Sequence, residues 1–124
     1  MNKSTFSIKK RIKSISFALN GITVFFKNEH NSHIHLIATI CVIFLGIYLE
    51  LNTIEWVVIT LAIGLVFISE IINSSIERLA DLVNKEISPE IKIIKDLAAA
   101  AVLFSAIISV IIGILVFGGK IFFN

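Results

Sequence analysis

Four polar side chains recur between residues 70 and 81, directly after an apolar run. They are Glu70, Asn73, Glu77 and Asp81, called the polar row below. At about 100° per residue of helix they fall within a stripe about 80° wide. A carboxylate at membrane depth costs roughly a few kcal/mol or more unless it meets a partner, a cation or water. We therefore interpret the polar row as functional.

The ionisable residues expected near the same membrane surface suit phosphate chemistry with a metal ion. They are Glu29, Glu70, Glu77, Asp81, Lys95 and Asp96. Mg²⁺ is usually held by one or two carboxylates together with substrate phosphates. A lysine can neutralise charge on a transferring phosphoryl group, and another carboxylate can accept the proton of an attacking hydroxyl. The sequence holds no Gly-x-x-x-x-Gly-Lys-Ser/Thr loop, so a bound nucleotide would need another cradle.

The composition predicts an integral membrane protein of one domain. The chain has 124 residues, of which 56% are hydrophobic and 16% charged. The net charge of +2 is too small to suggest nucleic-acid binding, and the single cysteine, Cys41, excludes a disulfide framework.

The periodicity predicts an all-α fold with an amphipathic surface helix and three transmembrane helices. We expect the surface helix over about residues 6–27, where apolar residues recur every three or four positions and lysines occupy the other face. The helices containing the membrane spans are expected over about 34–50, 54–83 and 89–119. Ser88 followed by Pro89 is typical of a helix start.

Loop charges predict the orientation. The first hairpin carries Glu50 and Glu55 and no base, whereas the second connection and the amino terminus are basic. By the positive-inside rule, the amino terminus is cytoplasmic and the carboxy terminus outside. Small residues also recur every fourth position from Ala101 to Gly113, which favours close packing against another helix or oligomerisation.

Two motifs resemble the signature of the small prokaryotic diacylglycerol kinase and undecaprenol kinase family. The first is Glu70-Ile-Ile-Asn73-Ser-Ser-Ile-Glu77 with Asp81, and the second begins at Lys95-Asp96. The resemblance covers nearly the whole chain. It implies one lipid-kinase domain over residues 1–124 in the inner (plasma) membrane of a bacterial cell, assembled as a homotrimer with its sites between subunits. It also implies transfer of the ATP γ-phosphate to a membrane lipid hydroxyl with Mg²⁺.

The resemblance also implies a role for each matching residue. Glu70 would be the general base, Glu29 and Glu77 the metal ligands, and Asn73 a polar contact that orients the site. The nucleotide contacts would come from the lysine that binds phosphate, two nearby acids and two small positions on the surface helix. These are Lys95, Asp96, Asp81, Ala18 and Gly21.

Four residues bear on the acceptor and on departures from the family pattern. His33, Ser32 and Ala100 stand where an arginine, an aromatic residue and a glycine are common. His35 resembles the undecaprenol kinases, whereas diacylglycerol kinases of the Gram-negative type carry a glutamate there. This favours undecaprenol over diacylglycerol as acceptor.

One alternative belongs to a different class: a small non-enzymatic channel or assembly subunit that uses the buried acids as an ion or proton path. Lys95 beside a carboxylate cluster argues against it. The spacing of His30, His33 and His35 does not favour a zinc site.

Overall fold

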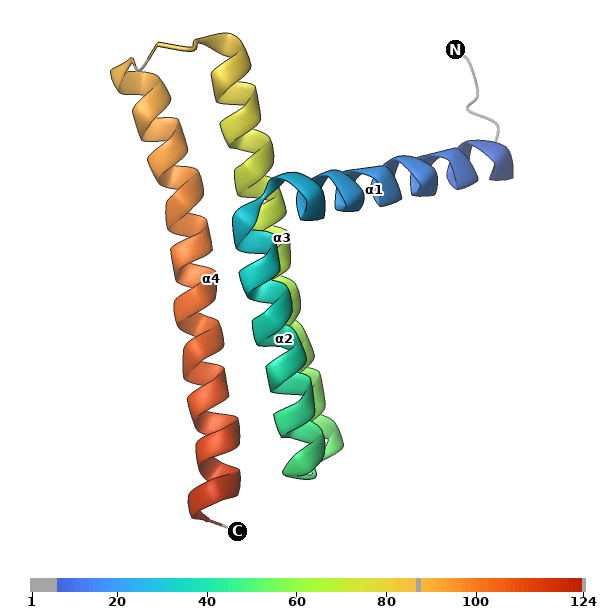
Figure 1. Ribbon diagram of the computed structural model, residues 1–124, viewed down its shortest axis with the longest axis vertical. Coiled ribbons are helices and arrows are strands. Elements are labelled where there is room, and N and C mark those ends of the chain that lie inside the picture. Colours follow the sequence, from blue (N-terminus) through green and yellow to red (C-terminus); the bar gives the residue numbers. More distant parts are fainter. Residues whose placement is uncertain (1–6, 87, 124) are drawn as a thin grey trace.

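The computed structural model describes residues 7–86 and 88–123, which form four helices (Figure 1). They are α1 (Ile8–Asn28), α2 (His30–Tyr48), α3 (Thr53–Val83) and α4 (Pro89–Phe122). The last three are long and apolar enough to cross a membrane, with mean hydropathies of 1.6, 2.1 and 2.9. The predicted all-α membrane fold is therefore confirmed. The expected start of the first helix at residue 6 lies outside the described residues.

The three apolar helices run side by side, and α1 lies crosswise to them (Figure 1). Helix α1 joins the bundle at the end of α2 that is nearer the α3–α4 connection. The α2–α3 turn and the carboxy terminus lie at the opposite end of the bundle. Ile8, Ile12 and Ile15 on α1 are exposed. An apolar face that the protein leaves uncovered fits a helix lying on a membrane surface.

Unequal helix lengths carry most of the polar row beyond the start of α2. The 19 residues of α2 span about 28 Å, close to the hydrocarbon thickness of about 30 Å. Helix α3 has 31 residues and shares a tight turn with α2, so it extends about 18 Å beyond the start of α2. The extension carries Asn73, Glu77 and Asp81, while Glu70 stays below it.

The α2–α3 turn is fixed by polar contacts at the end opposite α1. Asn52 and Glu55 form a capping box that starts α3. Lys120, near the end of α4, pairs with Glu55 at 3.3 Å. The pair anchors the end of α4 to this turn, and it explains a lone base at an end whose loop is otherwise acidic.

Gly46 is required where α2 meets α3. A Cβ atom at this position would lie 2.7 Å from the Trp56 ring and 3.0 Å from the Leu51 side chain. We expect Gly46→Ala to destabilise the fold by about 1–3 kcal/mol, because the half-buried Trp56 ring must shift. Thermal denaturation in detergent, followed by circular dichroism, measures the effect. Gly64→Ala is the control, since a Cβ there meets nothing within 4 Å; equal stability of the two variants would contradict the prediction.

The small-residue stripe of α4 packs on α3 of the same chain. The hydroxyl oxygens of Ser105 and Ser69 lie 2.7 Å apart, and the Ser109 hydroxyl donates to the Ala62 carbonyl at 3.0 Å. Approach of a side chain to the backbone of a neighbouring helix requires small residues at the contact. At these two serines, the partner helix that the sequence left open is α3.

Candidate functional site

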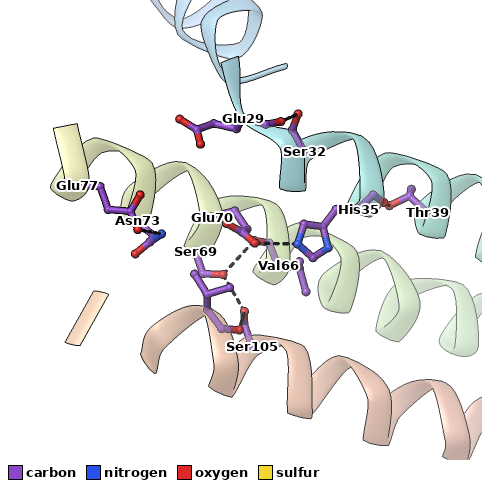
Figure 2. Close-up of polar contacts among 11 residues, drawn as sticks. Glu29, Ser32, His35, Thr39, Val66, Ser69, Glu70, Asn73, Glu77 and Ser105 are labelled. Atoms are coloured by element: carbon purple, nitrogen blue, oxygen red, sulfur yellow. Dashed lines mark hydrogen bonds and ion pairs between the residues drawn. The ribbon is translucent and has the colours of Figure 1, made fainter. Parts of the chain in front are cut away.

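Glu70 is buried on α3 and paired with a side chain of α2. Only 4% of the residue is exposed. Its Oε1 lies 2.8 Å from the Nε2 of His35, as Figure 2 shows. The Phe67 ring, one turn earlier on α3, contacts the imidazole edge to face with centroids 6.3 Å apart. The deepest acid of the polar row is thus held inside the bundle.

Asn73 and Glu77 form the next level of the polar row (Figure 2). The amide nitrogen of Asn73 donates to Glu77 Oε1 at 3.1 Å. The amide oxygen of Asn73 is buried, and within the described residues it has no hydrogen-bond partner. Such an oxygen costs about 1–3 kcal/mol unless a donor or cation meets it. Together with the Glu77 carboxylate it offers the hard oxygen atoms that Mg²⁺ prefers.

Glu29 lies at the junction of α1 and α2, where its extended backbone separates the two helices. Its carboxylate pairs with Arg78 of α3 at 3.4 Å. The pair is long and partly exposed, so it contributes little and leaves the carboxylate able to bind a cation. Arg78 did not emerge from the sequence as a site residue, because it counted there only as a loop charge.

Ala18 and Gly21 line a cavity of about 410 Å³ between α1 and α3 that also includes Glu29 and Arg78. A Cβ atom at Gly21 would meet nothing within 4 Å. The two small positions therefore leave open space beside a carboxylate and a guanidinium group.

Asp81 closes the polar row and meets α4 across the second connection. Lys95 Nζ lies 2.5 Å from Asp81 Oδ1, and Lys92 pairs with Asp96 one turn apart on α4. These four residues line a pocket of about 200 Å³ at the end of the bundle. The ammonium group of Lys95 suits a phosphate oxygen, which would take the place of Asp81 in that pair.

The site residues thus lie at separate levels along α3. Glu77 is about 10 Å along the helix axis from Glu70, and Asp81 is one turn farther. Among the residues described, no three His, Cys, Asp or Glu side chains gather as a metal-binding cluster. A metal held by Glu77 and Glu29 would need further oxygen ligands, which phosphates and water can supply.

Comparison with known proteins places these residues in a wider group. A family model described as prokaryotic diacylglycerol kinase matches residues 16–117. The chain is 39% identical to an undecaprenol kinase of Bacillus subtilis (strain 168), over 92% of this chain and 93% of that protein. It is 28% identical to a diacylglycerol kinase of Escherichia coli (strain K12), over 90% of this chain and 91% of that one. The family match includes every site residue described above.

Proposed function

The chain belongs to the prokaryotic diacylglycerol kinase family and is a lipid kinase of a bacterial membrane, and from that premise we propose that it transfers the γ-phosphate of ATP to the hydroxyl group of undecaprenol. The observation that carries the proposal is the polar row. It extends from a carboxylate buried among apolar helices to a charged pocket at the end of the bundle. A lipid hydroxyl can reach the first, and a water-soluble nucleotide the second.

In the proposed reaction, Glu70 accepts the proton of the acceptor hydroxyl while the hydroxyl oxygen bonds to the γ-phosphorus. The bond between that phosphorus and the bridging oxygen of ADP breaks, and the products are the lipid phosphate and ADP. Lys95 holds phosphate, with Asp81 and Asp96 positioning the nucleotide. Ala18 and Gly21 let the nucleotide approach α1 closely. For the residues on α3 and α4, this division follows their depth along the two helices.

We propose that Glu29 and Glu77 hold Mg²⁺. The buried amide oxygen of Asn73, which has no hydrogen-bond partner among the described residues, supports this fit, because a cation beside Glu77 would satisfy it. The bound ion would neutralise charge on the phosphate oxygens. Asn73 itself keeps Glu77 in place through the hydrogen bond from its amide nitrogen.

The choice of undecaprenol rather than diacylglycerol is supported by the 39% identity to an undecaprenol kinase. An apolar groove beside Glu70 suits the hydrocarbon chain of either lipid. The groove has a volume of about 410 Å³ and runs between α2, α3 and α4 from His35 toward the α2–α3 turn. Ala38, Val66 and Val110 are among its lining residues. An isoprenoid chain lying there would bring its terminal hydroxyl to the His35 end, next to Glu70.

Two further proposals concern the setting of the enzyme. We propose that the α1 end of the bundle faces the cytoplasm, where ATP is available, because α1 and the second connection carry most of the basic residues. We also propose a homotrimer with its sites between subunits, as the family resemblance implies. A second apolar groove, of about 610 Å³ between α3 and α4, is open to a neighbouring subunit.

Transfer of ³²P from γ-labelled ATP tests the function directly. The purified chain is assayed in mixed micelles with undecaprenol or a diacylglycerol at equal mole fraction, with Mg²⁺ or with excess EDTA. We expect Mg²⁺-dependent labelling, at least about tenfold faster with undecaprenol, because each 1.4 kcal/mol of preferential binding is worth a factor of ten. Faster labelling of diacylglycerol would mean that diacylglycerol is the preferred acceptor. Absence of labelling with both lipids would overturn the proposed reaction. Full activity in EDTA would contradict the proposed requirement for a metal ion.

A further inference from the structure

We propose that His35 is a positioning residue, whose Nε2–H donates a hydrogen bond to Oε1 of Glu70 and thereby aims the other carboxylate oxygen at the acceptor hydroxyl. The proposal rests on the proposed role of Glu70 as general base. It concerns a different question, which is how a base buried among apolar helices is held in one orientation.

The geometry of the pair supports a donor role for His35. The two atoms lie 2.8 Å apart, within the ordinary range for an N–H···O bond. In its proposed role as general base Glu70 is ionised and only accepts hydrogen bonds, so in that role Nε2 of His35 would carry the proton. Within the described residues, no other side chain has a recorded hydrogen bond to the Glu70 carboxylate. The orientation of Glu70 therefore depends on this one contact.

The imidazole packs against α3, and the backbone that carries it is held within α2. Its own helix fixes the backbone, where the Thr39 hydroxyl donates to the His35 carbonyl at 2.7 Å. From α3, the Phe67 ring meets it at an interplanar angle of 72°. A quarter of the His35 side chain remains exposed, against 5% for Glu70. The donor is thus fixed, while the acid it holds is almost completely enclosed.

Burial makes the contact matter more than an exposed ion pair would. A carboxylate without a partner in an apolar environment is strongly disfavoured, so loss of the donor would make Glu70 rotate toward water or another donor. A displacement of about 1 Å at a reacting group can lower a rate by about 10²-fold. Any side chain that places a hydrogen-bond donor at the position of Nε2 can orient Glu70 in this way. The side chain does not need to change its protonation state.

Two amide substitutions separate the position of the donor nitrogen from the chemical identity of the imidazole group. The glutamine amide nitrogen extends about as far from the backbone as Nε2, whereas that of asparagine ends near the position of Nδ1. We expect His35→Gln to keep kcat within about threefold of the wild type. We expect His35→Asn to lower kcat by about 10- to 100-fold with little change in KM for ATP, because the base is misplaced and the nucleotide pocket is intact. His30→Asn, an exposed position at the start of α2, is the control and should change kcat less than twofold.

A double-mutant cycle completes the test. In a Glu70→Gln background, His35→Asn should cause no further loss of lipid phosphorylation, since the group it positions is gone. Three results would overturn the proposal: wild-type kcat in His35→Asn, an equal loss in both amide variants from any cause, or losses that multiply in the cycle. The proposed function fails separately, if the wild-type chain labels neither lipid.

Discussion

Replacing Glu70 with glutamine is expected to lower kcat for lipid phosphorylation by about 10²- to 10⁴-fold, the range typical of a lost general base. Glutamine has almost the same shape and can still contact His35, so the variant should fold. Its amide cannot accept the proton of the acceptor hydroxyl. The KM for ATP should stay within about twofold, because Asp81 and Lys95 are unchanged. Single-turnover transfer of ³²P from ATP to undecaprenol measures the chemical step.

Glu50→Gln is the matched control for that variant. It also removes one carboxylate, from an exposed residue at the opposite end of the bundle, and should leave kcat within about twofold of wild type. A Glu70→Gln variant that retains more than a third of wild-type kcat would remove Glu70 from the role of base.

Lys95→Met is expected to produce the second largest loss, about 10²- to 10³-fold in kcat/KM for ATP. A loss of this size is usual when an enzyme loses one fixed hydrogen-bond donor that stabilises the charge developing in the transition state. Methionine keeps the length and apolar stem of the side chain but not its ammonium group. Only 36% of the Lys95 side chain is exposed, and its Nζ lies against Asp81, so its position is well defined. Initial rates over a range of ATP concentrations measure the loss.

Lys92→Met provides the comparison within the same pocket. Lys92 lies nearly one turn earlier on α4, and 65% of its side chain is exposed in its pair with Asp96. An exposed ion pair contributes about 0–1 kcal/mol, so a loss of at most a few-fold is expected. Equal losses in the two variants would mean that the pocket needs positive charge in general and that Lys95 has no specific phosphate contact.

The helices were predictable because their signals are local. Apolar runs of membrane length predict spans in any context, and Ser88 accepts the hydrogen bond expected of a helix cap, from Ile91 N at 3.3 Å. Helix boundaries that depend on the backbone angles of a single residue were harder to predict from the sequence. Helix α2 begins at His30 because Glu29 adopts an extended conformation, although polar residues continue to His33.

The site was predictable only in part. The spacing of the polar row requires its four members to share one face of α3, and the family resemblance supplies the roles proposed for them. No spacing rule links residues 35 positions apart, so the contact of His35 with Glu70 was not foreseen. The same holds for Arg78 and Glu29, which lie 49 positions apart.

Sequence alone was sufficient for the all-α membrane fold, the row on α3 and the family, because these follow from composition, helical periodicity and residue identity. The pairing of each acid depended on how the helices pack. Helix α3 extends beyond the start of α2. Glu70 lies below this extension, beside α2, and therefore meets a histidine inside the bundle. Beyond that point α3 continues beside α4, so Asp81 meets a lysine at the surface. Helix length and packing thus separate a buried carboxylate, the proposed base, from an exposed carboxylate–lysine pair, the proposed phosphate site, along a single stripe.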